Sequence, residues 1–422
     1  MKSSIIKTGT MLAGFLLAAC LSTHAEVKLP AIFSDGMMMQ QQTNANLWGT
    51  ATPHKKVTVT TSWNGKQYAA TADKKGAWKL TVATPEAGGP YTVTFDDGTK
   101  KTLNNILIGE LWLCSGQSNM EMPMKGFKNQ PVENANMDIL HSKNPQIRLF
   151  TVKRTSTFTP QNDVVGSWKE ANPVSVRDFS ATAYYFGRLV NEILDVPVGL
   201  VVAAWGGSAC EAWMTADWLK AFPEAKIPQT ETDIKSKNRT PTVLYNGMLH
   251  PLIGMTMKGV IWYQGEADAN SSKITMPAYT KAMESMVSDY RTVFNDDSLP
   301  FMYVQLAAFD NPGGEYAAMR EAQFNYMIGK NTTNGKPENV GMAVITDNTD
   351  NIKDIHPRNK SEVGRRLSLW ARKLVYNEEN LEYTGPIFKA VEQVTTEDGT
   401  KALKITFEDY SVMNGLKLKD NT

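Results

Sequence analysis

Four short segments of the sequence carry residue types that are used in acyl-transfer chemistry. Each lies at or just after the end of an apolar run, and the four are Gly116–Asn119, Trp205–Ser208, Tyr263–Glu266 and Asp347–His356. Together they supply a serine, a pair of glycines, a glutamine and an Asp/His pair. These are the parts of a hydrolytic site, namely a nucleophile, donors for an oxyanion, and a base with the group that orients it.

Ser118 is the candidate nucleophile, because the apolar run "ILIGELWLC" delivers it to the polar turn "GQSN". Of the five histidines, only His250 and His356 are candidate bases, since the others lie in the leader, in a β-rich segment and in a polar loop. His356 is favoured because Asp354 lies two positions upstream and because a helix is expected to open there.

Asp354 is the expected acid partner of His356, with Asp347 as the alternative and Asp350 as a further rival. Residues two apart on an extended segment lie about 6.5 Å from each other, so the loop must bend for Asp354 to reach the imidazole. Asp347 has no such constraint, because it follows its own apolar run. Asp354 could also serve only as a helix cap.

Each segment alone also fits an ordinary structural role. Gly206-Gly207 could be a turn, and Gln264 and Glu266 could be solvated loop residues. A carbohydrate-binding protein without catalysis is a competing interpretation, in which tryptophans near the strand ends would stack on sugars: Trp112, Trp205, Trp213 and Trp262. A peptidase or lipase is less favoured, since the G-x-S-x-G motif is absent around Ser118. The complete serine, histidine and oxyanion set favours an esterase.

The elements that must position these residues alternate between strand and helix from about residue 106 to residue 380. This pattern predicts an α/β domain with a mostly parallel sheet, in which ligands bind beyond the carboxyl ends of the strands. Residues 26–105 read instead as short strands with Asn-Gly and Asp-Gly turns, which predicts a small antiparallel β-domain. Residues 381–422 return to β character.

Bulk composition and the N-terminus limit the setting in which the protein works. The 422 residues carry a formal net charge of +1, which gives no electrostatic case for nucleic acid or an anionic membrane as partner. Residues 1–25 have the charged, apolar and small-residue order of an export signal. We therefore expect a periplasmic or secreted protein, with a lipid anchor on Cys20 as the alternative. Cys114 and Cys210 could pair or be two buried thiols.

The sequence resembles the sialate O-acetylesterase family, a group of SGNH-hydrolase-like carbohydrate acetylesterases. Six motifs occur in order and carry this resemblance: "LWLCSGQSNMEMPM", "WGGSACEAWM", "LYNGMLHPL", "VIWYQGEADAN", "MREAQ" and "DIHPRNKSEVGRRLSLWA". "LPAIFSDGMMMQ" resembles the N-terminal β-domain of the family. The resemblance implies a three-layer, flavodoxin-like SGNH domain over residues 106–380, preceded by a β-sandwich.

The resemblance also implies roles for individual residues. Ser118 belongs to the nucleophile block and His356 to the final block, while the oxyanion donors are Ser118, Gly207 and Gln264. The residues expected to contact an acetylated sugar are Gln117, Asn119, Trp205 and Glu266. The expected reaction is removal of O-acetyl groups from sialic acid through an acetyl-serine, with acetylated xylan or another plant glycan as the alternative substrate and with no metal or organic cofactor. One departure is the Asp-x-His spacing, where SGNH enzymes commonly have Asp-x-x-His.

Overall fold

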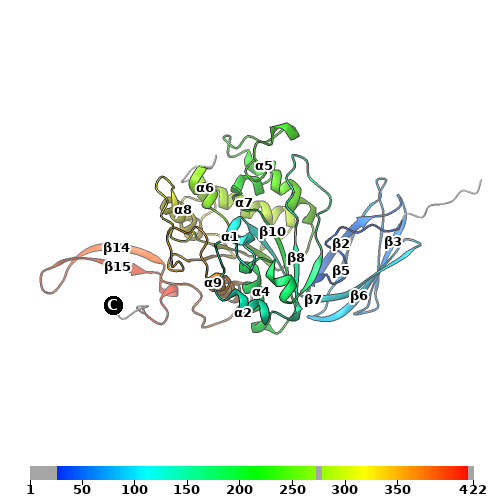
Figure 1. Cartoon of the computed structure of the whole chain (residues 1–422), viewed down its shortest axis with the longest axis horizontal. Coiled ribbons are helices and arrows are strands. Elements are labelled where there is room, and N and C mark those ends of the chain that lie inside the picture. The colour runs from blue at the N-terminus through cyan, green and yellow to red at the C-terminus, as the bar shows by residue number, and fades with distance from the viewer. Residues whose placement is uncertain (1–25, 272–277, 417–422) are drawn as a thin grey trace, which may run out of the picture.

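The computed structural model describes residues 26–271 and 278–416, so the expected export signal and Cys20 lie outside the described residues. A central α/β body carries a small β-domain at one end and a projecting hairpin at the other (Figure 1). Within the described residues, no helix is long and apolar enough to cross a membrane. Cys114 and Cys210 are both buried and unpaired.

The central sheet has seven strands, and all neighbours are parallel except the last pair. In spatial order they are β13 (Val340–Ala343), β12 (Phe301–Val304), β11 (Gly259–Tyr263), β7 (Lys100–Gly116), β10 (Val198–Ala204), β8 (Asn144–Thr151) and β9 (Trp168–Ala171). Without β8 and β9, the order is that of flavodoxin-like folds, 2-1-3-4-5. The order reverses beside β7, so ligands are expected where β7 and β11 end.

Helices cover both faces of this sheet, as the sequence pattern predicts. On one face lie α4 (Ala181–Leu194) and α9 (Lys360–Leu374), and on the other lie α7 (Ala278–Phe294) and α8 (Tyr316–Ile328) (Figure 1). Trp112 of β7 packs edge-on against Phe186 of α4, while Trp262 of β11 packs against Tyr290 of α7. The short helices are α1 (Ser118–Glu121), α2 (Ala135–Leu140), α3 (Pro173–Arg177), α5 (Ala216–Leu219) and α6 (Glu266–Ser271).

Strand β7 is longer than the apolar run suggests, because it also belongs to the N-terminal β-domain. Its first half pairs with β6 (Gly88–Asp96) and β1 (Met38–Gln40), and its second half pairs with β10 and β11. The expected boundary between residues 105 and 106 therefore falls inside one continuous strand. The path from the β-domain to Ser118 contains no flexible linker.

The β-domain is built from two packed antiparallel layers. One contains β3 (Lys56–Thr61), β4 (Gln67–Thr71) and β6, and the other contains β2 (Asn44–Thr50) and β5 (Ala77–Ala83). Trp78 of β5 meets Phe95 of β6 with ring centroids 5.9 Å apart, and both side chains are buried. Side chains from the facing surfaces of the two layers therefore pack against each other.

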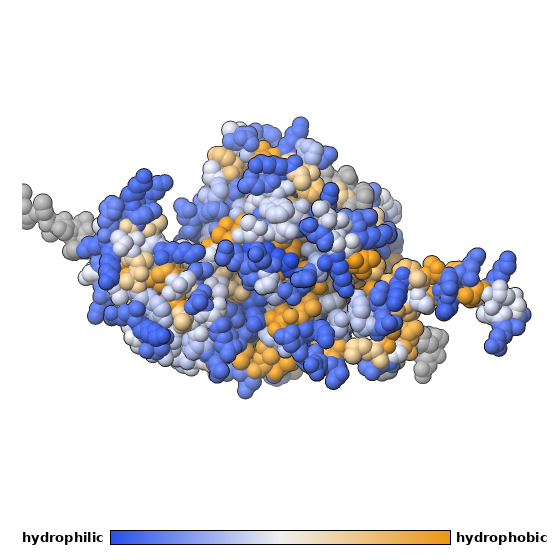
Figure 2. Space-filling view, turned by 180° about the vertical axis from the view of Figure 1, so that it is seen from behind, coloured by the Kyte–Doolittle hydropathy of each residue, from blue (hydrophilic) through white to orange (hydrophobic). Residues whose placement is uncertain are grey.

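The C-terminal hairpin consists of β14 (Phe388–Thr395) and β15 (Lys401–Phe407) and projects from the body (Figure 1). Val391, Leu403 and Ile405 are more than half exposed. Figure 2 shows apolar surface on the projecting part. The hairpin supplies none of the residues expected in the functional site.

Candidate active site

Ser118 lies on a sharp turn at the end of β7, where the strand order reverses. Gly116 has a φ of +141°, and a side chain there would collide with the Tyr263 carbonyl of β11. The glycine therefore lets two neighbouring strands end at the same point. Ser118 is the first residue of α1, so the turn delivers its hydroxyl directly from the sheet.

Ser118 and His356 meet, although they are far apart in sequence. The Ser118 Oγ lies 2.9 Å from His356 Nε2, and His356 Nδ1 lies 3.1 Å from the Gln130 Oε1. With its proton on Nδ1, the imidazole donates to Gln130 and accepts from Ser118. This is the tautomer that a base needs in order to take the serine proton.

Gln130, rather than Asp354, lies at the second nitrogen of His356, which corrects the expectation of a direct carboxylate contact. Asp354 reaches the ring only through this amide, whose Nε2 donates to Asp354 Oδ1 at 2.8 Å. The same carboxylate accepts from the backbone N–H of His356 at 3.0 Å. The loop bends, but it turns Asp354 toward its own backbone. Sequence reasoning missed Gln130, which no motif or spacing connects to His356.

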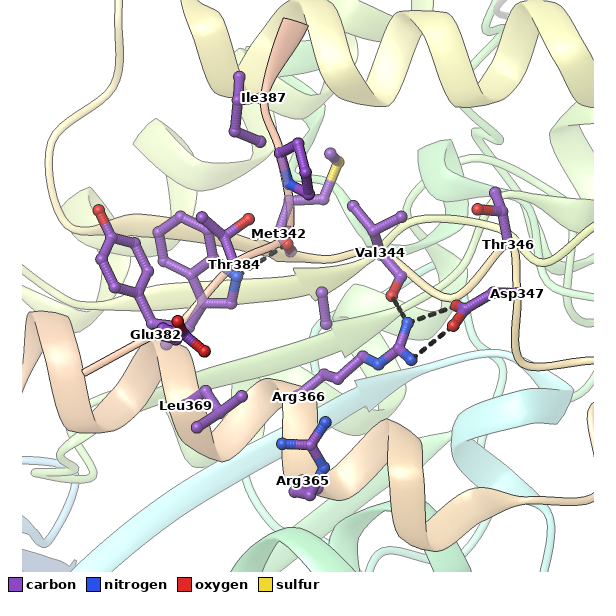
Figure 3. A pocket seen from close by; sticks show the side chains of 15 residues that line it. Met342, Val344, Thr346, Asp347, Arg365, Arg366, Leu369, Glu382, Thr384 and Ile387 are labelled. Atoms are coloured by element: carbon purple, nitrogen blue, oxygen red, sulfur yellow. Dashed lines mark hydrogen bonds and ion pairs between the residues drawn. The ribbon is translucent and has the colours of Figure 1, made fainter. Parts of the chain in front are cut away.

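Asp347, the alternative acid, lies in an ion pair with Arg366. Arg366 Nη1 and Nη2 donate to its two carboxylate oxygens at 2.6 and 2.9 Å (Figure 3). Arg366 also donates to the Val344 carbonyl, and Trp370 donates to the Met342 carbonyl. These bonds cover the outer edge of the sheet near β13, so Asp347 supports an edge strand there.

Two backbone N–H groups beside Ser118 are open to receive an oxyanion. Within the described part of the chain, no hydrogen bond involves the N–H of Ser118 or of Gly207. Gly206 is held on both sides, because Glu121 Oε2 accepts from its N–H and Asn238 Nδ2 donates to its carbonyl, both at 2.7 Å. A trans peptide directs its N–H away from its carbonyl, so Asn238 orients the Gly207 donor. Sequence reasoning did not single out Asn238.

Gln264 is placed differently from the expectation. Its side chain is fully buried, and its Nε2 donates to the Ser208 carbonyl at 2.9 Å and to Asp268. Its Oε1 accepts from the Tyr279 hydroxyl at 2.8 Å. Both amide protons therefore have protein acceptors, which favours a structural role beneath the site over a direct contact with an oxyanion.

Of the residues expected to touch substrate, three are buried under the turn. Gln117 Oε1 accepts from the backbone N–H groups of Gly265 and Ala267, and Asn119 donates to Glu266 at 2.5 Å. These bonds join the ends of β7 and β11. The buried side chains of Gln117, Asn119 and Glu266 therefore fix the turn that carries Ser118. Trp205 is partly exposed and lies next to Gly206, so its contact with substrate stays a prediction.

The other three tryptophans of the competing, purely sugar-binding interpretation are fully buried. Trp112, Trp213 and Trp262 each have no exposed surface. They pack in the core and cannot stack on a ligand, so that interpretation loses most of its support. His250, the second candidate base, contacts the Gln161 carbonyl through Nδ1 and does not reach Ser118.

Two basic groups of the site, His356 and Lys360, have pKa values well below their ordinary values. Burial, followed by the charge of Lys360, lowers the pKa of His356 to about 4, against an opposing effect of Asp354. Burial also lowers the pKa of Lys360 to about 7, although Glu266 and Asp354 act against this shift. Burial raises the pKa of Glu266. His356 is therefore neutral, as a base must be, from neutral pH well into the acid range.

Cys210, Glu211 and Asp268 lie close enough together to hold a metal ion. Burial, followed by the charges of Asp268 and Glu211, raises the pKa of the Cys210 thiol far above its ordinary value. The sulfur therefore stays protonated and donates to Glu211, while Asp268 accepts from Gln264. The three side chains thus form a buried polar cluster that also contacts Gln264.

Comparison with known proteins decides the family. The sequence profile described as carbohydrate esterase, sialic acid-specific acetylesterase, matches residues 108–368. The chain belongs to this family. It is also 30% identical over 397 residues to the sialate O-acetylesterase of Homo sapiens, covering 86% of this chain and 73% of the human protein. The protein of that name from Mus musculus is 30% identical over 440 residues, which cover 89% of this chain and 79% of the mouse protein.

A solved structure supports the same assignment. A carbohydrate acetylesterase from Xanthomonas citri is 34% identical and superimposes with a TM-score of 0.78, covering 90% of this chain and 81% of that one. The expected membership of the sialate O-acetylesterase family is therefore confirmed, and the protein is a carbohydrate esterase. The matched region contains Ser118, Gly207, Asn238 and His356.

Proposed function

We propose that this esterase of the sialic acid-specific family removes O-acetyl groups from acidic sugars of the sialate type through an acetyl-serine intermediate, on an SGNH-type hydrolase domain. The observation that carries the proposal is the 2.9 Å contact between Ser118 Oγ and His356 Nε2, next to the open N–H groups of Ser118 and Gly207. Relatives named sialate O-acetylesterase support the choice of substrate.

The reaction proceeds in two steps. His356 Nε2 takes the hydroxyl proton of Ser118 while Oγ attacks the acetyl carbonyl carbon, and the N–H groups of Ser118 and Gly207 stabilise the oxyanion. The bond to the sugar oxygen then breaks, and that oxygen receives the proton from His356. In the second step water gives a proton to His356 and attacks the acetyl group. Ser118 Oγ leaves, recovers the proton, and acetate is released.

Arg154 favours an acidic sugar over a neutral one. Its Nε donates to Glu121 at 2.5 Å, and its guanidinium lies over the Trp205 ring, 5.6 Å from the centroid. The side chain is 52% exposed, and its Nη groups donate no hydrogen bond to any described residue. A side chain added at Gly206 would contact Ser118 Cβ at 3.4 Å and Glu121 at 3.2 Å, so this corner adjoins the nucleophile. An Arg fork there can bind a carboxylate.

The first test is the variant Ser118→Ala. We expect acetate release from acetylated sugars to fall by about a thousandfold or more while the fold is retained, because no other group forms the acyl intermediate. An active-site phosphonate should label the wild type at Ser118, as read by peptide mass spectrometry. Labelling at another serine, or substantial turnover by the variant, would overturn the proposal.

The second test concerns substrate choice. Acetate release should be compared for an O-acetylated sialic acid, an acetylated xylo-oligosaccharide and 4-nitrophenyl acetate, in the wild type and in Arg154→Gln. We expect Arg154→Gln to lower kcat/KM for the sialic acid by about tenfold, the range for one charge-assisted contact, and to spare the other two. If the variant keeps the wild-type ratio of kcat/KM for the sialic acid to kcat/KM for the xylo-oligosaccharide, Arg154 does not recognise the carboxylate; a wild-type preference for the xylo-oligosaccharide would overturn the choice of an acidic sugar.

We also propose that the protein is exported, since residues 1–25 have the order of a signal sequence. Mature protein from its native host should begin near Glu26 or at a lipid-modified Cys20. Recovery of protein with Met1 intact would exclude both.

A further inference from the structure

Asn119 connects the turn that carries the nucleophile with the loop that carries the base. It follows Ser118 in the chain, and its Nδ2 donates to the carbonyl of Ile355, which precedes His356, at 3.0 Å. The same amide nitrogen donates to Glu266 Oε1 at 2.5 Å. The Asn119 side chain has no exposed surface. One fixed amide therefore sets the separation between Ser118 and His356.

Lys360 binds the oxygen of the Asn119 side-chain amide. Its Nζ donates to Asn119 Oδ1 and lies 5.4 Å from the centroid of the Tyr263 ring, and the residue is fully buried. Lys360 is also the first residue of α9, where a positive charge is disfavoured by the helix dipole. Burial of an ammonium group is costly as well. Neither the helix nor the core accounts for a lysine at this position.

We propose that Lys360 is a positioning residue of the esterase: through Asn119 it fixes Ser118 against His356, and it places a buried cation beneath this pair. This inference rests on the proposed roles of Ser118 and His356.

The groups around His356 agree with this assignment. Lys360 opposes the protonated imidazole, whereas Asp354 favours it and is itself within 3.8 Å of the Arg358 Nε. Gln130 is neutral, and Phe127 presents its ring edge-on at a centroid distance of 5.3 Å. Lys360 has a pKa of about 7, so its charge is present throughout the acid range in which His356 titrates. Lys360 is therefore the charge that opposes uptake of a proton by the base.

The experiment compares the pH dependence of kcat/KM for 4-nitrophenyl acetate in four forms of the protein: wild type, Lys360→Met, Lys360→Arg and Lys373→Met. Lys373 lies in the last turn of the same helix and serves as the matched control. We expect Lys360→Met to lower kcat by about tenfold or more with little change in KM, and to move the acid limb of the profile upward by about half a unit or more. Lys360→Arg should keep the acid limb in place, and Lys373→Met should match the wild type.

An acid limb that stays in place in Lys360→Met, or an unchanged kcat, would overturn the proposal. Removing one partner can leave Glu266 as an unbalanced buried charge, so the double variant Lys360→Met/Glu266→Gln is measured as a second form without either charge. The acid limb of the double variant should also lie at a higher pH than that of the wild type. Failure of both variants to fold would count against the proposal, because a purely structural lysine gives that result. Turnover by Ser118→Ala would instead contradict the proposed function itself.

Discussion

Gln130 occupies the place in which serine esterases usually hold a carboxylate beside the histidine. A neutral amide can fix the imidazole tautomer through Nδ1, but it carries no charge to stabilise the imidazolium that forms in the transition state. Asp354 supplies a negative charge one hydrogen bond farther away, through Gln130 Nε2. The base of this enzyme is therefore oriented by an amide and only indirectly stabilised by an acid.

The acid limb of the pH profile follows from this environment. His356 must be neutral to accept the serine proton, and its pKa is lowered from 6.5 to about 4. We expect kcat/KM of the wild type to stay level from about pH 7 to about pH 5 and to reach half its plateau near pH 4, since this parameter reports the free enzyme. Steady-state assays across pH 3.5–8 check this, with circular dichroism at each pH to exclude unfolding. A limb near the ordinary histidine value would contradict it.

The lowered pKa of His356 also makes the free energy of unfolding depend on pH. Because the folded protein holds His356 at a lowered pKa, the unfolded chain binds more protons in the window from about 6.5 down to about 4. The contribution of His356 to the free energy of unfolding is therefore fully present above that window and is lost as the pH falls through it.

At the scale of residues, the sequence was sufficient for the groups that lie within recognisable motifs. Ser118 and His356 follow apolar runs, and the structure brings them together. Gln130 and Asn238 could not be found in this way, because each lies in a polar loop and acts only through a tertiary contact. Lys360 was part of a quoted motif, but its burial depends on how α9 meets β7 and β11, which no local pattern reveals.

At the scale of elements, strands and helices were predicted where the period of apolar residues is strong. The runs "VPVGLVVAAWGG" and "DFSATAYYFGRLVNEILD" form β10 and α4, and Ser180 caps α4 by accepting from the Ala183 N–H at 3.0 Å. The pattern of apolar residues could not predict which strands pair or how the edge of the sheet is covered. Trp370 and Arg366 satisfy carbonyls at the outer edge of the sheet near β13, an arrangement that blunts an otherwise open edge.

At the scale of the whole molecule, composition and element order predicted an α/β body with a β-domain before it. The extent of β7 was not predicted, because its first half is more polar and reads as part of the preceding β-domain. The β character of the C-terminal segment was predicted, but the projection of its β14–β15 hairpin from the body was not, since exposed Val391, Leu403 and Ile405 resemble the residues of a buried strand.

The shared strand β7 sets an order in which the protein can acquire its fold during synthesis. Its first half pairs with β6, which directly precedes it in the chain, whereas its second half must wait for β10 and β11. Contacts between distant segments form slowly, because a long loop must be closed first. In refolding followed by pulsed hydrogen exchange, the amides of residues 101–107 should gain protection before those of residues 111–115, and simultaneous protection would contradict this. During synthesis the β-domain can therefore be complete while the apolar second half of β7 still lacks both of its partner strands. Until β11 has been synthesised, this second half is exposed and prone to misassembly.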